Sequence, residues 1–136
     1  MAQRICIVED DESIQDILKI ILQNAGYETI IFPDGHPIME NNYSFPDLFL
    51  LDKQLQDIDG LIICEYLKSN NHTKEIPVVM MSAYPNVKEL ALCAGANDFI
   101  EKPFAMSLLL KTIKTLLQRQ TVEYVSHSLN GLQQQG

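Results

Sequence analysis

The stretch FLLDKQLQDIDG, residues 49–60, contains an apolar run that ends abruptly on a carboxylate. Residues 48–51 are all apolar, and Asp52 follows them directly. Short apolar runs bounded by polar residues are typical of strands that are buried on both faces of a sheet. The acid and glycine further along, Asp59 and Gly60, are expected to make the turn into the next helix. The stretch therefore predicts a buried strand that holds Asp52 rigidly at its end.

Similar apolar segments alternate with segments of helical spacing along the chain. The predicted strands cover residues 5–8, 27–32, 47–51, 77–81 and 98–101. The predicted helices cover residues 14–25, 37–44, 61–67, 86–94 and 106–118, of which 37–44 is at best a short helix. Strands that alternate with helices indicate an α/β fold in which helices cover both faces of a parallel sheet.

The composition is that of one globular domain. The chain has 136 residues, of which 46% are hydrophobic, and this is enough for a core in a domain of this size. A net charge of −8 argues against non-specific binding to nucleic acid or to an anionic membrane. No apolar segment approaches the roughly 20 residues that span a bilayer, and the N-terminus turns acidic too early for a signal peptide. We expect a cytoplasmic domain over residues 1–120, followed by a tail or the start of a linker over 121–136.

The cysteines and histidines give no sign of a metal or disulfide site. The three cysteines are widely spaced, which predicts neither a disulfide framework nor a zinc site. We expect them to be small buried hydrophobic residues in a reducing compartment. The three histidines lie far apart in polar context and are expected at the surface.

Polar side chains follow several of the predicted strands at the points where these strands end. The first strand is followed by Glu9, Asp10 and Asp11, the third by Asp52, the fourth by Ser82 and the fifth by Lys102. In an open parallel sheet, ligands bind outside the carboxyl ends of the strands, so these groups can converge on one pocket. Asp11 is also a candidate cap for the helix that follows it.

A cluster of carboxylates needs a compensating cation or a shared proton. Two unit charges about 4 Å apart repel by roughly 4 kcal/mol at an intermediate dielectric constant. Oxygen ligands suit Mg²⁺, and Mg²⁺ with a nearby ammonium is the set that neutralises a transferred phosphoryl group. A carboxylate can also be the nucleophile and form an aspartyl phosphate. The residues therefore indicate phosphoryl transfer, and Asp52 is the best candidate acceptor because it stands alone on its strand.

The chain resembles the receiver domain of two-component response regulators over about residues 3–119. The motifs that carry the resemblance are IVEDDE, PDLFLLDKQLQDIDG, PVVMMSA and GANDFIEKPF, in this order and at near-family spacing. Each motif is weak alone, but together they are highly specific. The resemblance implies a flavodoxin-like (βα)5 fold with strand order 2-1-3-4-5.

The resemblance also implies roles for the acids of the pocket. Asp52 is expected to be the phosphoacceptor. The implied Mg²⁺ site consists of Asp10 as a direct ligand, Glu9 acting through water, Asp52, and the backbone carbonyl of Gln54. Mg²⁺ is the only cofactor that the resemblance implies.

Further roles fall on the last two strands. The resemblance implies that Lys102 pairs with the phosphoryl oxygens and that Ser82 donates its hydroxyl to them, with Ala83 leaving room. Phe99 stands at the aromatic switch position of the family, and the bond between Lys102 and Pro103 is expected to be cis.

Several positions depart from the family pattern. Gln56 stands where proline is usual, and Phe99 lacks the hydroxyl that many receivers have there. The segment between residues 82 and 96 is shorter than usual. Gln54 and Tyr84 flank the pocket at positions that influence the lifetime of the phosphoryl group in the family.

We therefore expect a receiver that is phosphorylated on Asp52 by a sensor histidine kinase or a histidine phosphotransfer protein. Its own chemistry is expected to be self-catalysed phosphotransfer and autodephosphorylation, not metabolic catalysis. No DNA-binding or catalytic domain is expected after residue 119, and no direct contact with nucleic acid or insertion into a membrane. The signal is expected to leave through residues 85–118, which bind a downstream protein or a second copy of the chain.

Other functions stay open at this stage. The domain can be a phosphate relay or sink without its own output, or a pseudo-receiver that serves only for docking. An alternative from a different class of protein is that the chain is a flavodoxin-like enzyme that binds a small molecule. That function requires a loop rich in Ser, Thr or Gly after the first strand, whereas residues 9–12 are Glu-Asp-Asp-Glu and repel phosphate.

Overall fold

The computed structural model describes residues 2–119 and shows one parallel sheet of five strands in the order β2-β1-β3-β4-β5. The strands are β1 (Arg4–Val8), β2 (Glu28–Phe32), β3 (Leu48–Asp52), β4 (Val78–Ser82) and β5 (Asp98–Glu101). Each strand lies within one or two residues of its predicted position. The predicted parallel α/β fold and its strand order are therefore confirmed, while the predicted tail at 121–136 lies outside the described residues.

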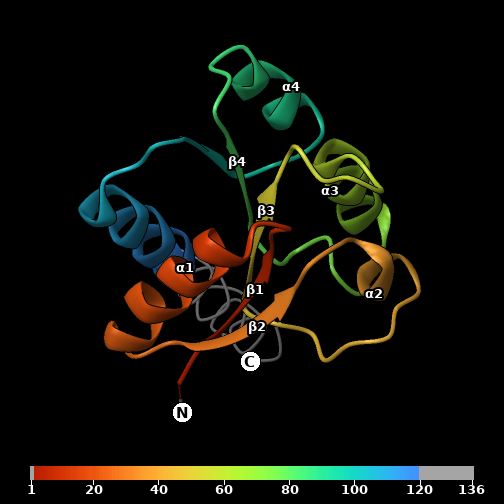
Figure 1. Cartoon of the computed structure of the whole chain (residues 1–136). Coiled ribbons are helices and arrows are strands. Elements are labelled where there is room, and N and C mark those ends of the chain that lie inside the picture. Colours follow the sequence, from red (N-terminus) through yellow and green to blue (C-terminus); the bar gives the residue numbers. More distant parts are fainter. Residues whose placement is uncertain (1, 120–136) are drawn as a thin grey trace, which may run out of the picture.

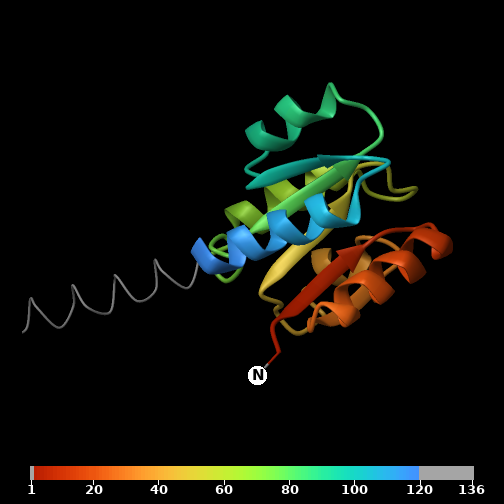
Figure 2. The same ribbon diagram turned by 90° about the vertical axis from the view of Figure 1, so that its left-hand side faces the viewer.

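Helices cover both faces of this sheet. The helices are α1 (Glu12–Asn24), α2 (His36–Met39), α3 (Gly60–Ser69), α4 (Val87–Cys93) and a further helix over residues 106–119, called helix 106–119 below. Figures 1 and 2 show α1 and helix 106–119 on one face of the sheet, with α2 and α3 on the other. Among the described residues no helix is long and apolar enough to cross a membrane.

The side chains of each strand alternate between two apolar layers. Ile5 and Ile7 of β1 pack in one cluster with residues of α1 and helix 106–119. Cys6 and Val8 pack in a second cluster with residues of α2, α3 and α4. Each fully buried side chain of this size contributes about 1.5–3 kcal/mol, so the strands form a rigid platform. The strands appear as unbroken apolar runs in the sequence because both faces are covered.

Local signals set the ends of the helices. The side chain of Asp11 accepts a hydrogen bond from the backbone N–H of Ile14 at 3.1 Å and caps α1, as expected. Gly26 follows the end of α1 with φ of 94°, in the left-handed region that glycine adopts readily. The short helix expected within 37–44 is present as α2, and it ends at Met39. Asn41 has φ of 57°, and this left-handed residue cannot continue the helix.

Candidate functional site

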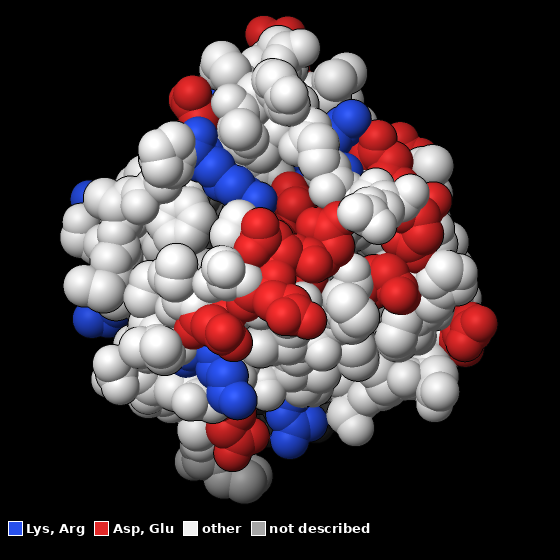
Figure 3. All heavy atoms as spheres, viewed as in Figure 1, with Lys and Arg blue, Asp and Glu red and all other residues white. Residues whose placement is uncertain are grey.

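The candidate site lies at the edge of the sheet where β1, β3, β4 and β5 end. Val8 is in register with Leu51, and Asp52 is in register with Met81. The residues that follow β1 and β4 therefore lie on either side of Asp52. Figure 3 shows acidic side chains gathered in the centre of this face, over the ends of β1 and β3 in Figure 1. The predicted convergence of the strand-end acids is thus present.

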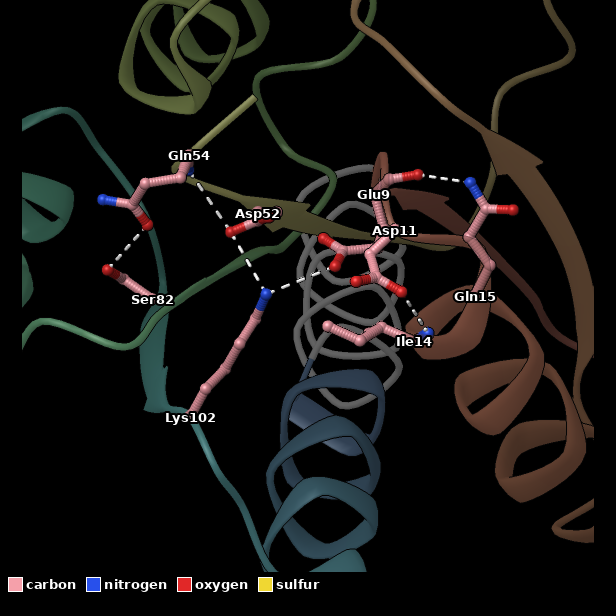
Figure 4. A network of polar contacts seen from close by, with 8 residues as sticks. All are labelled: Glu9, Asp11, Ile14, Gln15, Asp52, Gln54, Ser82 and Lys102. Atoms are coloured by element: carbon pink, nitrogen blue, oxygen red, sulfur yellow. Dashed lines mark hydrogen bonds and ion pairs between the residues drawn. The ribbon is translucent and has the colours of Figure 1, made fainter. Parts of the chain in front are cut away.

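Three carboxylates form the centre of the site. Oxygens of Glu9, Asp10 and Asp52 lie within 4.8 Å of one another. Glu9 and Asp52 are buried, with exposed fractions of 1% and 4%, and Asp10 is half-buried. The ammonium nitrogen of Lys102 lies 3.3 Å from Glu9 Oε1 and 3.3 Å from Asp52 Oδ1 (Figure 4). One ammonium therefore pairs with two of the three clustered acids, Glu9 and Asp52.

The pKa of the Glu9 carboxyl is raised in this crowded site. Burial is the largest cause that raises its pKa to about 8, and the hydrogen-bonding contact and negative charge of Asp52 raise it further. Lys102 acts in the opposite direction but does not cancel these effects. The second carboxyl oxygen of Glu9, Oε2, is buried and has no hydrogen-bond partner. Glu9 thus combines an unsatisfied oxygen with an environment that disfavours its charge.

These features fit a bound divalent cation. Three hard oxygen donors and a buried oxygen without a partner form a donor set that suits Mg²⁺ better than a softer metal. A cation would satisfy the free Glu9 oxygen, and its positive charge would offset the burial and the Asp52 charge that raise the Glu9 pKa. The chemistry of the donors therefore fits the Mg²⁺ that the sequence led us to expect.

Ser82 is connected to the acids through Gln54. The Ser82 hydroxyl donates to Gln54 Oε1 at 3.0 Å and accepts from the backbone N–H of Tyr84 at 3.1 Å. The backbone N–H of Gln54 donates to Asp52 Oδ1 at 3.3 Å (Figure 4). Sequence reasoning assigned a role only to the backbone carbonyl of Gln54. The contact of its side chain was missed because no sequence spacing links positions 54 and 82.

The loop after Asp52 is fixed by the start of α3. Asp59 caps this helix by accepting from the backbone N–H of Leu61 at 2.8 Å, and its other oxygen lies 2.9 Å from Lys53 Nζ. A Cβ atom at position 60 would collide with the backbone carbonyl of Asp52, so only glycine allows this approach. The expected turn at Asp59 and Gly60 is confirmed, and Gly60 in addition holds the backbone of Asp52.

The remaining candidates lie around this centre. Asp11 caps α1 and is not among the clustered carboxylates. Phe99 on β5 is half-buried and packs against the core layer that contains α3 and α4. Ala83 is exposed, and the Lys102–Pro103 bond is cis, as expected. The roles assigned to the pocket residues stay predictions.

Two expectations for other residues have different outcomes. Cys6 and Cys64 are buried, but Cys93 is exposed because it lies on the solvent side of α4, so the expectation of burial is wrong for Cys93. His36 lies at the surface as expected, where its Nδ1 is 3.2 Å from Asp34 Oδ1 and 2.8 Å from Asp57 Oδ2. These contacts join the loops that follow β2 and β3.

A family model described as "Response regulator receiver domain" matches residues 5–114. The chain belongs to the response-regulator receiver domain family. The DNA-binding dual master transcriptional regulator RpaA of Synechocystis sp. is 34% identical over 119 residues, which cover 85% of this chain and 49% of that protein. The DNA-binding response regulator MtrA of Mycolicibacterium paratuberculosis is 33% identical over 126 residues, which cover 90% and 55%. This receiver chain thus spans about half the length of these curated relatives.

Solved structures agree with this assignment. A putative response regulator from Chloroflexus aurantiacus matches the receiver with a TM-score of 0.82 at 30% identity, covering 87% of this chain and 99% of that chain. NtrX from Brucella abortus matches with a TM-score of 0.85 at 33% identity, covering 95% of this chain and 30% of that chain. The flavodoxin-like enzyme alternative finds no support in these comparisons.

Membership of the family has direct consequences. Receiver domains of two-component systems are signalling domains, not a family of catalytic enzymes. They typically bind Mg²⁺ at an acidic pocket, and this receiver has an acidic cluster at the corresponding edge of its sheet. They also interact with histidine kinases or histidine phosphotransfer proteins.

Proposed function

We propose that this receiver accepts a phosphoryl group on Asp52 from the phosphohistidine of a sensor histidine kinase or a histidine phosphotransfer protein. The observation that supports this assignment is the position of Asp52. Its carboxylate lies at the end of a fully buried strand, with Lys102 and the backbone N–H of Gln54 each 3.3 Å from Oδ1. The acid is rigidly held at the end of its strand, Glu9 and Asp10 lie beside it, and the Lys102 ammonium pairs with it.

The transfer exchanges one bond to phosphorus for another. A carboxylate oxygen of Asp52 attacks the phosphorus atom, the bond between phosphorus and the histidine nitrogen breaks, and its electron pair returns to the imidazole. Lys102 can follow the charge by moving from Glu9 and Asp52 to the new phosphoryl oxygens. Mg²⁺ held by Glu9, Asp10, Asp52 and the backbone carbonyl of Gln54 would supply positive charge to offset that of the phosphoryl group.

The protonation state of Glu9 affects the binding of the cation. A carboxyl with a pKa of about 8 is largely protonated at neutral pH, whereas a metal site needs the carboxylate. Cation binding therefore has to expel a proton from Glu9. We propose that occupancy of the site is linked to pH through this residue.

We further propose that phosphorylation changes the binding surface over residues 85–118. Large apolar side chains are exposed there on α4 and at the start of helix 106–119, namely Leu90, Leu92, Met106 and Leu108. Phe99 lies between these elements on β5, and its burial can transmit a change at Ser82 to the surface. The proposed partner is a downstream protein or a second copy of the chain.

The proposal does not extend to contacts with DNA. The printed names of RpaA and MtrA describe DNA-binding regulators, and this chain spans about half of each. We propose that the receiver itself makes no direct contact with nucleic acid, because an acidic chain of net charge −8 repels phosphates. We also propose that it acts in the cytoplasm, where histidine kinases donate their phosphoryl groups.

Incubation with acetyl phosphate and Mg²⁺, followed by intact-mass measurement, tests the assignment. The parent should gain one phosphoryl group, and Asp52→Ala should gain none. Asp57→Ala is the matched control, since Asp57 is a more exposed acid on the same loop. Equal phosphorylation of Asp52→Ala and the control would exclude Asp52 as the acceptor.

A further inference from the structure

The hydroxyl of Ser82 has a single proton, and Gln54 holds it. Ser82 is fully buried, its Oγ lies 3.0 Å from Gln54 Oε1, and the N–H of Tyr84 occupies its acceptor side at 3.1 Å. A carboxamide oxygen only accepts, so the Ser82 proton must point toward Gln54. In this arrangement Ser82 has no proton to give to any other group.

This hydrogen bond conflicts with the role that the family resemblance implies for Ser82, which is to donate to the phosphoryl group. The inference rests on the proposed function in this respect. A phosphoryl group on Asp52 needs donors for its oxygens, and Ser82 can donate only after it leaves Gln54. The two residues lie close together because Asp52 is in register with Met81, the residue before Ser82. Figure 4 shows Gln54 and Ser82 on one side of Asp52, with Glu9 on the other.

The backbone at Gln54 is anchored within its loop, while the side chain is exposed and contacts Ser82. Its backbone N–H donates to Asp52 Oδ1 at 3.3 Å. The preceding residue, Lys53, pairs with Asp59 at 2.9 Å, and its carbonyl accepts from the N–H of Gly60 at 3.0 Å. These contacts at Lys53 and Gln54 therefore fix the point of the backbone from which the Gln54 carboxamide reaches Ser82.

We propose that the Gln54 side chain is a positioning residue that restrains Ser82 in the resting state, so that phosphorylation of Asp52 must compete with the Gln54–Ser82 hydrogen bond. The bond lowers the fraction of molecules in which Ser82 is ready to meet a phosphoryl oxygen. The apparent affinity for a phosphoryl mimic falls with that fraction. A net contribution typical of one hydrogen bond corresponds to about 2- to 12-fold in this equilibrium.

Gln54→Met tests the proposal, because methionine keeps the length of the side chain while its thioether is a poor acceptor. Gln56→Met is the matched control, since Gln56 is an exposed glutamine on the same loop. The apparent Kd for beryllofluoride in the presence of Mg²⁺, followed by NMR titration, should fall about 2- to 12-fold in Gln54→Met and stay at the parent value in the control. An unchanged or weaker affinity in Gln54→Met would overturn the proposal.

A double variant separates this restraint from a direct effect of Gln54 on the mimic. In a Ser82→Ala background, Gln54→Met should leave the Kd for beryllofluoride unchanged, because the residue acts only through the Ser82 hydroxyl. The same gain in affinity in both backgrounds would refute the mechanism.

Hydrogen exchange of the Tyr84 amide, measured without Mg²⁺ or beryllofluoride, tests the restraint of Ser82 independently of the proposed function. Loss of the Gln54 contact should free Ser82 to rotate away from the Tyr84 N–H, and hydrogen exchange of that amide should become faster in Gln54→Met. Unchanged exchange would overturn the restraint. Failure of the parent to bind beryllofluoride, with exchange accelerated in Gln54→Met, would instead contradict the proposed function and leave the restraint in place.

Discussion

The ammonium nitrogen of Lys102 lies 3.3 Å from Oδ1 of Asp52, across the end of β4 that separates the two residues in the sheet. The same nitrogen lies 3.3 Å from Glu9. Lys102 thus links the end of β5 through charge to the ends of β1 and β3, which are not its neighbours in the sheet.

Removal of this ammonium should destabilise the metal-free protein. Lys102→Met leaves buried carboxylates without their cation, and we expect the free energy of unfolding in urea at pH 8 to fall by roughly 1–3 kcal/mol. Saturating Mg²⁺ should restore most of the loss. Lys53→Met is the control, because its partner Asp59 is partly exposed and such pairs contribute about 0–1 kcal/mol. Equal losses in the two variants would show that Lys102 does not compensate the acids.

The raised pKa of Glu9 predicts a definite pH dependence of stability. The ordinary carboxyl value is 4.5, and the folded protein holds the proton until about pH 8. Between these values the folded state binds more protons than the unfolded state, so stability falls as the pH rises. Glu9→Gln should remove this fall and be more stable than the parent by roughly 1–3 kcal/mol at pH 8.5 without Mg²⁺.

Urea unfolding at several pH values without Mg²⁺ measures both curves. The affinity of the parent for Mg²⁺ should also rise with pH up to about 8, because the cation displaces the Glu9 proton. A parent whose stability and Mg²⁺ affinity are flat between pH 5 and 8 would contradict the protonated state assigned to Glu9.

The two aspartates after Glu9 should differ in their effect on Mg²⁺. Asp10→Asn should weaken Mg²⁺ binding at least about tenfold, because Asp10 belongs to the carboxylate cluster. Asp11→Asn should leave the affinity almost unchanged, because asparagine also caps helices and Asp11 is engaged with α1. Titration of both variants decides the matter, and a larger loss in Asp11→Asn would reverse the assignment.

A switch and a relay predict different responses to a phosphoryl mimic. If phosphorylation acts through Ser82 and Phe99, hydrogen exchange should change across residues 85–118 when beryllofluoride and Mg²⁺ are added. Burial of Phe99 alone can contribute roughly 1–3 kcal/mol, which shifts a two-state population about 5- to 150-fold. Changes confined to the loops around Asp10 and Asp52 would instead favour a relay without surface output.

The sequence was sufficient to predict the sheet and the carboxylate pocket for a physical reason. Strands buried on both faces must be apolar throughout, so Asp52 and Glu9 are conspicuous where the runs end. The parallel arrangement then brings these ends together without any knowledge of side-chain contacts. The length of α2 was not predictable in the same way, because it depends on the left-handed conformation of Asn41.

The finer features of the pocket depend on three-dimensional packing. The pKa of Glu9 follows from its complete burial beside Asp52, and no sequence pattern reports burial at that level. The contact between Gln54 and Ser82 joins the loop after β3 to the last residue of β4, and the separation of these two positions along the chain has no characteristic spacing. Gly60 had a visible role in the turn, but its approach to the backbone of Asp52 appears only in the folded structure.

The most direct test of the central claim is to locate the phosphoryl group itself. The protein is phosphorylated with Mg²⁺ by a histidine kinase or acetyl phosphate, the acyl phosphate is reduced with borohydride, and the reduced residue is located by peptide mass spectrometry. We predict homoserine at position 52 and no reduction at positions 9, 10 or 57. Reduction at one of these other acids, giving homoserine at position 10 or 57 or 2-amino-5-hydroxypentanoic acid at position 9, with Asp52 intact, would contradict the assignment of Asp52 as the phosphoacceptor.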